Sequence, residues 1–516
     1  MEKNAWIAGL DEVFPLTPLD QAAPRIYTRL VYGFRFPDTK NIEAAVSYLQ
    51  AGLHRAFTQW PFLAGQVIHP ADSQHARAVF SRDPQKFNLG SFPGEVFAYQ
   101  ILDQSVFPTY EQLQKKGNAP SAMDKDVLSL SPSHPVQGKT YHPLTLRATF
   151  IEGGLLLGFS SHHSVLDGSS LAEFLKCFAG NDGYADRLPS SYSHLDELIK
   201  DRLHLINTSY PPPDLTNPNY LPEYNFTSAY SPPPLSPPGA IPCTAKVLTF
   251  SSHKITTLHA QNLSQIRSLH GSNAFISQTD TLCGLIWVTV IQARHSLNLL
   301  PRARSSESSV KSRFATAIDI RHLLPLRLPN SYYMGNLYLR LMPCLPVFTL
   351  LTPHHPHDAL AAAAHAIRQS ILSLKTDADG TDSLLARHLG MIHWHTYHTS
   401  GGLDALNKAS SEALSNDHDG DYTGLDNSVW THMGADVCFN IPGTGTEPRA
   451  EWVRKTYSAN GGSMNLLPRR RRRRRGRRKL EEGEEEEEES NWEVLLALRD
   501  DEMEAVEGEL RRGGFL

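Results

Sequence analysis

The fold is decided by residues 155–179, which read LLLGFSSHHSVLDGSSLAEFLKCFA. The apolar run at 155–159 predicts a β-strand, and the apolar positions between 171 and 178 recur at the i, i+3, i+4 and i+7 spacing of an α-helix. The change of period leaves 160–168 as a tight connection at the end of a strand. Polar side chains on such a connection are fixed at their base and free at their tip, which suits a reactive group.

Two adjacent histidines, a carboxylate and a glycine lie in this connection, namely His162, His163, Asp167 and Gly168. An imidazole titrates near neutral pH, so His163 could take a proton from a hydroxyl or amine and return it to a leaving group. Gly168 has no Cβ, which allows a sharp turn or the close approach of a substrate. A purely structural alternative is open at this point: the histidines are polar strand-end residues, and Asp167 only caps the following helix.

The order His162-His163-x-x-x-Asp167-Gly168 resembles the HHxxxDG signature of the CoA-dependent acyltransferases. That superfamily includes the plant and fungal BAHD enzymes, chloramphenicol and carnitine acyltransferases, and the condensation domains of peptide synthetases. The resemblance implies an α/β fold of two chloramphenicol-acetyltransferase-like domains, each a mixed sheet flanked by helices, with an active-site channel at their interface.

The amino-terminal stretches narrow the resemblance to one branch. LTPLD at 16–20 precedes an alternating run at 27–34 that predicts a strand, and helical spacing follows at 42–57. WPFLAG at 60–65 then ends the helix with a proline. This order is similar to the amino-terminal part of fungal trichothecene 3-O-acetyltransferase-like enzymes. Residues 144–159 predict a hairpin that brings His163 to the edge of a sheet.

The middle of the chain predicts a boundary between two domains. Prolines crowd between positions 210 and 242, and a segment rich in proline is stiff, extended and poor in amide donors, as expected for a linker. We therefore expect an N-terminal domain at 1–205 that carries HHxxxDG, a linker or crossover at 206–245, and a C-terminal domain at 246–516.

Three segments extend the resemblance into the second half. QTDTLCGLIW at 278–287 resembles the family's T-x-D-x-L-x-A-x-x-W helix, and AIDIR at 317–321 with YYMGN at 332–336 resembles its V-D-x-R and Y-x-G-N block. In the family, the arginine of this block pairs with the aspartate of the histidine motif. The resemblance therefore implies an ion pair between Arg321 and Asp167 that holds the shape of the loop.

The family's last motif, D-F-G-W-G, is only partly present. ADVCFN at 435–440 keeps the aspartate Asp436 and an aromatic, Phe439. In the family this motif is structural and lies away from the histidine, so its loss separates the chain from plant-like members more than it affects activity. Ser428 and Trp430 occur where the family has a Ser-Trp segment, and by analogy they are candidate oxyanion donors, with a backbone amide as the alternative.

The resemblance thus assigns catalysis to His163 and Asp167, with Arg321 and Gly168 supporting the site and His162 in a structural role. It implies an acyl-CoA-dependent O- or N-acyltransferase that moves an acyl group, in the first instance acetyl, to a small molecule of secondary metabolism. No covalent enzyme intermediate is needed, because His163 acts as a base. Two alternatives stay open, a condensation-type domain with a carrier-bound donor and an inactive ligand-binding relative.

The composition restricts the partners. The 516 residues carry a net charge of −5 and are 40% hydrophobic, so no overall field indicates nucleic acid or membrane. The five cysteines are scattered without C-x-x-C spacing, which predicts reduced thiols in the cytoplasm rather than a zinc site. With no signal peptide or membrane span apparent, we expect a cytoplasmic monomer. Acyl-CoA is its predicted co-substrate, with neither a metal nor a permanently bound cofactor.

A block of opposite charges at 469–490 interrupts the end of the chain, with ten arginine or lysine residues followed by eight glutamates. We predict a disordered, solvated insertion whose halves attract each other. Nuclear import or nucleic-acid contact is the alternative, but the glutamates cancel the field and no aromatic residues are interleaved for base stacking.

Overall fold

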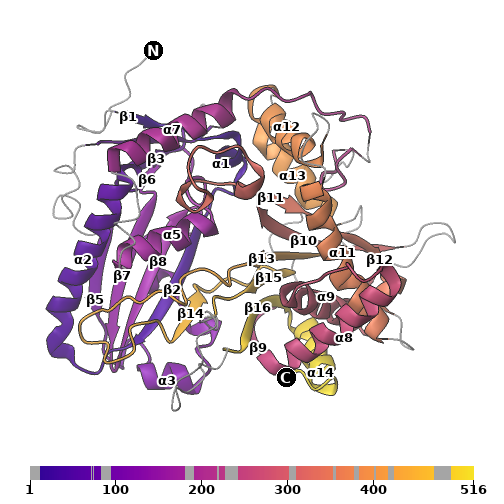
Figure 1. The fold of residues 1–516 in the computed structure, drawn as a ribbon. Helices are drawn as coiled ribbons and strands as arrows, with labels where there is room; N and C mark the ends of the chain where they lie inside the picture. Colours follow the sequence, from indigo (N-terminus) through magenta and orange to yellow (C-terminus); the bar gives the residue numbers. More distant parts are fainter. Residues whose placement is uncertain are drawn as a thin grey trace, which may run out of the picture.

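The structure, a computed structural model, describes residues 12–70, 73, 75–82, 95–180, 191–217, 220–226, 242–300, 310–351, 356–376, 383–399, 402–415, 424–469 and 490–516. Within these residues the strands form three sheets with helices packed on them. Most of the first half of the chain, coloured indigo to magenta, lies on one side of the molecule, and most of the second half lies on the other (Figure 1).

A five-stranded sheet carries the histidine segment. Its order is β14-β2-β8-β7-β5, and these strands span Trp452–Lys455, Tyr27–Arg35, Gly154–His162, Leu144–Ile151 and Phe97–Ile101. β7 and β8 form the predicted hairpin, with Gly153 in the turn at a φ of 73°. β8 is buried along its whole length, because alternate side chains enter two different hydrophobic cores on the two faces of the sheet.

Two predicted helices cover one face of this sheet. α2 (Ile42–Gln59) ends just before Pro61, and α5 (Gly168–Ala179) follows β8 directly. α5 ends at Gly180 in the left-handed conformation, with a φ of 64°, which glycine adopts without strain. Both helices therefore begin and end close to where the apolar periodicity of the sequence predicts.

A four-stranded sheet lies beside the first, in the order β1-β4-β3-β6. Its strands span Glu12–Phe14, Arg77–Phe80, Gln66–Ile68 and Thr140–Tyr141. The short helix α1 (Pro18–Ala22) follows β1 and begins with a capping box, in which the side chains of Thr17 and Asp20 bond each other's backbone N–H groups. This cap places the carboxylate of Asp20 in the interior, where it is fully buried.

A seven-stranded mixed sheet forms the centre of the second half. Six strands follow the order β11-β10-β13-β15-β16-β9, and β12 pairs with β10. In this order they span Tyr338–Leu341, Lys311–Asp319, Leu425–Val429, Ser463–Leu466, Trp492–Arg499 and Cys243–Phe250, with β12 at Cys344–Pro346. α9 (Gln278–Ser296), the predicted tryptophan-bearing helix, is buried on nearly every side among α8, α11 and α14.

The other helices connect and cover these sheets. They are α3 (Tyr110–Lys115), α4 (Lys125–Leu128), α7 (Ser191–Asn207), α8 (Ser252–His270), α10 (Val347–Leu350), α11 (Pro356–Thr376), α12 (Leu384–Tyr397), α13 (Gly402–Ser415) and α14 (Asp500–Arg512), with 3₁₀ turns at Thr39–Asn41, Pro61–Ala64, Pro120–Ala122, Arg321–Leu323 and Asn330–Tyr332. None of the helices in the described ranges combines the length and the apolar character needed to cross a membrane.

The chain returns to the first sheet late in the sequence. β14 pairs with β2, and Phe439 packs in the same core, with its ring centroid 5.2 Å from that of Phe34. Phe439 thus has the structural role that the family resemblance implied. The division at 1–205, 206–245 and 246–516 stays a prediction, and the last of these segments contributes β14 to the sheet of the first.

Part of the predicted linker at 206–245 packs against the protein. The ring of Phe226 is stacked on that of His395 in α12, at a centroid distance of 4.9 Å. The proline runs beyond it fall on residues 227–241, outside the described residues.

The predicted insertion at 469–490 falls almost wholly on residues 470–489, which lie outside the described residues. Its two end residues are placed: Nη2 of Arg469 donates to the carbonyl of Ser490 at 2.7 Å, and the guanidinium lies 3.9 Å from the ring centroid of Trp492. The insertion therefore leaves and re-enters the β15–β16 pair at adjacent points.

Candidate active site

His163 follows the last residue of β8, and Asp167, four residues later, is the N-cap of α5. The His163 N–H donates to the carbonyl of Ile26 at 2.9 Å, and the Leu166 N–H donates to the carbonyl of His162 at 3.2 Å, which closes the turn. One carboxylate oxygen of Asp167 accepts the N–H of Ser170 at 2.9 Å, as a helix N-cap does. Asp167 therefore does cap the helix, as the structural alternative predicts.

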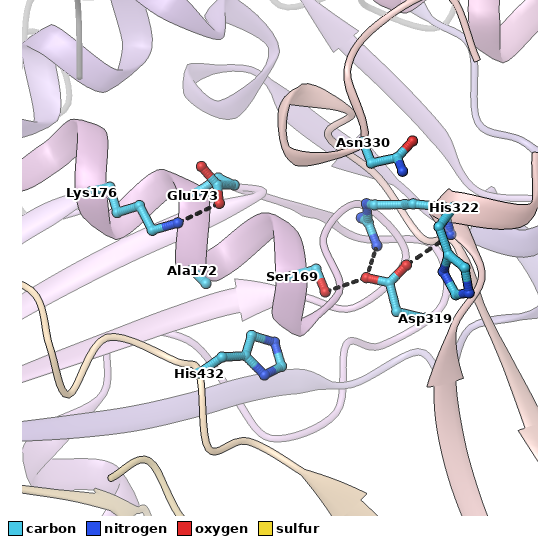
Figure 2. Close-up of a pocket in the computed structure, with 9 residues that line it drawn as sticks. Ser169, Ala172, Glu173, Lys176, Asp319, His322, Asn330 and His432 are labelled. Carbon is cyan, nitrogen blue, oxygen red and sulfur yellow. Dashed lines mark hydrogen bonds and ion pairs between the residues drawn. The ribbon is translucent and has the colours of Figure 1, made fainter. Parts of the chain in front are cut away.

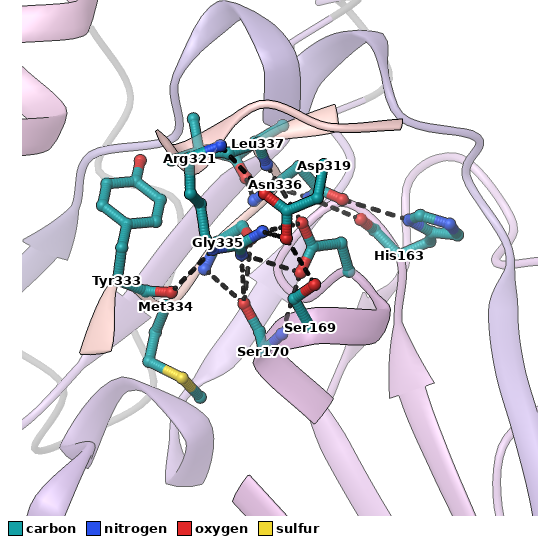
Figure 3. Close-up of polar contacts among 12 residues, drawn as sticks. His163, Ser169, Ser170, Asp319, Arg321, Tyr333, Met334, Gly335, Asn336 and Leu337 are labelled. Carbon is teal, nitrogen blue, oxygen red and sulfur yellow. Dashed lines mark hydrogen bonds and ion pairs between the residues drawn. The ribbon is translucent and has the colours of Figure 1, made fainter. Parts of the chain in front are cut away.

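The same carboxylate also forms the predicted ion pair. Nη1 and Nη2 of Arg321 lie 2.9 and 2.8 Å from the two oxygens of Asp167, a bidentate arrangement. Figure 3 shows the surroundings of Arg321, which include Ser170 and Gly335. The Leu337 N–H adds a fourth donor at 3.1 Å. The side chains of Asp167 and Arg321 are both about 5% exposed. The two residues are 154 positions apart in the sequence, so this buried ion pair, called the clamp below, joins the two halves of the chain.

The guanidinium of Arg321 also forms hydrogen bonds with residues other than Asp167. Besides Asp167, its guanidinium donates to the Ser170 hydroxyl at 3.0 Å, to the Gly335 carbonyl at 2.8 Å and to Asp319 at 2.9 Å. Burial alone would raise the pKa of Asp167, but the Arg321 charge, together with the hydrogen bonds that Arg321 and the N–H groups of Ser170 and Leu337 donate to the carboxylate, outweighs it and holds the pKa below its usual range. Because the pair is bidentate and fully bonded, it fixes the turn between β8 and α5.

The imidazole of His163 is half-buried and is held along one edge. Its Nδ1 lies 3.2 Å from Oδ1 of Asn336, and Nδ2 of Asn336 donates to the His163 carbonyl at 2.7 Å. The ring of Tyr338 in β11 lies 5.7 Å away. Within the described residues Nε2 of His163 forms no hydrogen bond.

The remaining predicted site residues are Gly168, Ser428 and Trp430. Gly168 is the first residue of α5, where an added Cβ would come within 2.0 Å of Cε of Met433. Ser428 is the penultimate residue of β13 (Leu425–Val429), and Trp430 directly follows the strand, with Nζ of Lys455 5.9 Å from the indole ring centroid. The oxyanion role assigned to Ser428 and Trp430 stays a prediction.

Sequence reasoning misses Asn336 and Asp20 as site residues, because each lies inside a larger motif, YYMGN at 332–336 and LTPLD at 16–20. Both are fully buried, and they contact each other across 316 positions of the chain. A polar residue inside a motif of apolar and small residues, such as the asparagine of YYMGN, is the signal that could have singled out Asn336.

A pocket of about 350 Å³ opens beside the clamp (Figure 2). Its lining residues come from α5, from the end of β10 with the turns that follow it, and from the loop after β13: Ser169, Ala172, Glu173, Lys176, Asp319, Arg321, His322, Asn330 and His432. Ser169 donates to Asp319 at 2.5 Å, and Glu173 pairs with Lys176 at 2.6 Å. His163 does not line this pocket, so a channel that reaches the histidine stays a prediction.

His162 points away from His163 and pairs with His69 of the neighbouring loop. Their Nε2 atoms are 2.9 Å apart, and both rings are nearly fully buried. The Ser164 N–H donates to Nδ1 of His162 at 3.2 Å, so Nε2 of His162 carries the proton that His69 accepts. This pair joins the two sheets of the first half as two neutral rings, in agreement with the structural role expected of His162.

The histidine pair predicts that acid destabilises the protein. Burial, together with neighbouring histidines and Arg25, lowers the pKa of His162 to about 3, and burial with Arg25 lowers that of His69 to about 4. The unfolded chain, with ordinary histidine pKa values, binds protons first, so stability is lost as the pH falls below about 6.5. We expect the free energy of unfolding to drop by about 2 kcal/mol per histidine between pH 7 and pH 5.

Urea unfolding at the two pH values measures this slope. Replacement of His162 by glutamine should flatten it, whereas His54→Ala at an exposed site of α2 should leave it unchanged. Equal slopes in the wild-type and His162→Gln proteins would show that the pair does not sense acid.

Two family descriptions match the chain. The trichothecene 3-O-acetyltransferase-like N-terminal domain matches residues 26–180, and the transferase family matches residues 118–345. Together they span more than half of the 516 residues. The matched region includes the histidine loop and the arginine that clamps it.

Curated relatives are fungal. The O-acetyltransferase dmxR13 of Cryptosporiopsis sp. (strain 8999) is 27% identical over 320 residues, which cover 60% of this chain and 63% of the relative. The trichothecene 8-O-acetyltransferase of Fusarium sporotrichioides is 25% identical over 350 residues, covering 63% of this chain and 66% of the relative. The chain thus matches less than two thirds of the length of either protein.

Solved structures share the fold over the whole chain. F. graminearum TRI101, in complex with coenzyme A and deoxynivalenol, matches with a TM-score of 0.70 at 18% identity and covers 98% of this chain and 99% of that chain. Vinorine synthase matches with a TM-score of 0.53 at 16% identity, covering 99% and 95%. The predicted two-domain α/β fold is confirmed. Residues 26–180 of the chain therefore match the trichothecene 3-O-acetyltransferase-like N-terminal domain, and residues 118–345 match the transferase family.

Proposed function

We propose that this protein transfers an acyl group, in the first instance acetyl, from acyl-CoA to a hydroxyl or amine of a small secondary metabolite. The observation that carries the proposal is the half-buried imidazole of His163, bonded through Nδ1 and free at Nε2, on a turn fixed by the Asp167–Arg321 clamp. The curated relatives, O-acetyltransferases among them, support this reaction class.

In the proposed reaction Nε2 of His163 takes the proton of the acceptor hydroxyl or amine. The freed oxygen or nitrogen forms a bond to the thioester carbonyl carbon, and the carbonyl electrons move to its oxygen. When the tetrahedral intermediate collapses, the C–S bond breaks and the sulfur leaves with the electron pair. The thiolate then takes the proton back from Nε2, so that free CoA and the acylated acceptor are released with no covalent enzyme intermediate.

The negative oxygen of the intermediate needs a donor. Trp430 and Ser428 are the proposed donors, with a backbone amide as the alternative. Asp167 and Arg321 do not take up or release protons in this scheme. They keep the turn in place while His163 changes its protonation state, and Gly168 allows the chain after the clamp to pass close to Met433.

Release of free thiol tests the reaction class. With acetyl-CoA and a panel of polyketide, terpenoid and alkaloid alcohols or amines, we expect thiol release that depends on the acceptor and stops when the acceptor is omitted. Acyl transfer only from a carrier-bound donor would instead indicate a condensation-type domain. A melting temperature raised by CoA, without turnover on any acceptor, would indicate a ligand-binding relative.

The proposed setting is a cytoplasmic monomer of two domains. All five cysteines, Cys177, Cys243, Cys283, Cys344 and Cys438, are free thiols, which suits a reducing compartment. Sedimentation of the purified protein at micromolar concentration should give the mass of a single chain. A larger species would contradict the monomer.

A further inference from the structure

The amide of Asn336 stands between His163 and a buried carboxylate. Its Nδ2 lies 2.7 Å from the carbonyl oxygen of His163 and 2.9 Å from Oδ1 of Asp20, and its Oδ1 lies 3.2 Å from Nδ1 of His163. The backbone N–H of Asn336 also donates to Asp20, at 2.9 Å. Every polar atom of this side chain therefore has a partner, and the side chain is fully buried.

The partners of Asp20 are all donors. The backbone N–H and hydroxyl of Thr17 donate to Oδ2 at 2.7 and 2.8 Å, and the guanidinium of Arg202 pairs with the same oxygen. The side chains of Asp20 and Arg202 are both 0% exposed. Because a carboxylate in such surroundings only accepts, it requires the NH₂ end of the Asn336 amide to face it.

This requirement fixes which way the amide points. In the opposite orientation the amide oxygen would face both the carboxylate of Asp20 and the carbonyl of His163, and two buried acceptor–acceptor contacts would replace two hydrogen bonds. The oxygen of Asn336 must therefore face Nδ1 of His163. Since an amide oxygen only accepts, the proton of the neutral imidazole lies on Nδ1, and Nε2 carries the lone pair.

We propose that Asn336, oriented by the buried Asp20–Arg202 pair, is a positioning residue that holds His163 in the Nδ1–H tautomer and so makes Nε2 the base. This inference rests on the proposed function for its catalytic consequence, but the tautomer itself can be measured without activity. In the other tautomer Nε2 would carry a proton and could not accept one from the acceptor. Two distant parts of the chain, Asp20 in α1 and Asn336 before β11, thus act together on one imidazole.

The first experiment is ¹⁵N NMR of the full-length protein with labelled histidine, above the titration range of the imidazole. The signal of His163 is assigned as the one lost in His163→Ala. We expect Nδ1 of the wild-type protein to show the shift of a protonated nitrogen and Nε2 that of a bare one. The reverse pattern in the wild-type protein would overturn the proposal, whether or not the protein turns over acyl-CoA.

The second experiment replaces Asn336 by alanine or serine. In Asn336→Ala the tautomer preference should weaken, and kcat should fall by about 10- to 100-fold while KM for acetyl-CoA stays within a factor of two, as is typical of lost partners behind a reactive group. In Asn336→Ser the hydroxyl can still accept a hydrogen bond from Nδ1 of His163, so we expect a smaller loss of kcat. The variant Asn262→Ala is the matched control, because Asn262 is also fully buried but lies in α8.

The readouts separate the outcomes. An unchanged tautomer with an unchanged kcat in Asn336→Ala would overturn the proposal. If the variant does not fold, the wild-type NMR measurement and Asn336→Ser still decide it. A wild-type protein that is inactive toward every acyl-CoA, yet shows the Nδ1–H tautomer, would contradict the proposed function and leave the positioning role intact.

Discussion

Replacing His163 by alanine is expected to lower kcat for acyl transfer by about 10²- to 10⁴-fold, the usual contribution of a general base. The physical reason is that Nε2 of His163 is the one imidazole nitrogen of the clamped turn that forms no hydrogen bond within the described residues. Removing it leaves the acceptor hydroxyl with no base. The rate of thiol release from acetyl-CoA in the presence of a working acceptor measures the effect.

The fold should survive this change. The ring of His163 is half-buried, and the only hydrogen bond that its side chain forms in the described residues is the one to Asn336, which water can replace. We expect the melting temperature to change by a few degrees at most. The variant His54→Ala, at an exposed site in α2, is the matched control and should keep full activity. A His163→Ala protein that retains most of its activity would refute the assignment of the base.

Replacing Arg321 by methionine is expected to cost about 3–5 kcal/mol of unfolding free energy and most of the activity. The change leaves Asp167 buried without its counter-ion, and an unpaired buried charge is far more costly than the loss of an exposed pair. Removing the guanidinium also removes the donors to Ser170, Gly335 and Asp319. Urea unfolding monitored by tryptophan fluorescence measures the loss of stability.

A surface pair gives the control for this prediction. Arg35 bonds Glu451 at 2.7 Å, but its side chain is 62% exposed, so Arg35→Met should cost less than about 1 kcal/mol. The double variant Asp167→Asn/Arg321→Met removes the stranded charge and should recover part of the stability without restoring activity, because the turn is no longer clamped. Equal stability losses in Arg321→Met and Arg35→Met would show that the clamp is not the buried ion pair described here.

The local structure around the site could be predicted from the sequence. The strand β8, the turn and α5 follow from a change of apolar period within 25 residues, and the hairpin β7–β8 follows from two apolar runs around Gly153 and Gly154. Such features depend on neighbouring residues, and local periodicity is the strongest signal that a single sequence contains. The ion pair of Asp167 with Arg321 came from the family resemblance rather than from spacing.

The sequence by itself therefore determined the elements that carry His163 and pointed to this imidazole as the candidate base. Only the tertiary structure decided what acts on that imidazole. Asp20, Asn336 and Arg202 come from three distant parts of the chain and meet in the interior, and no local pattern specifies such a meeting. The direction of the Asn336 amide, and with it the nitrogen of His163 that carries the proton, is set by the charge of a carboxylate 316 positions away. The physical reason is that a buried polar group must find its partners wherever folding brings them.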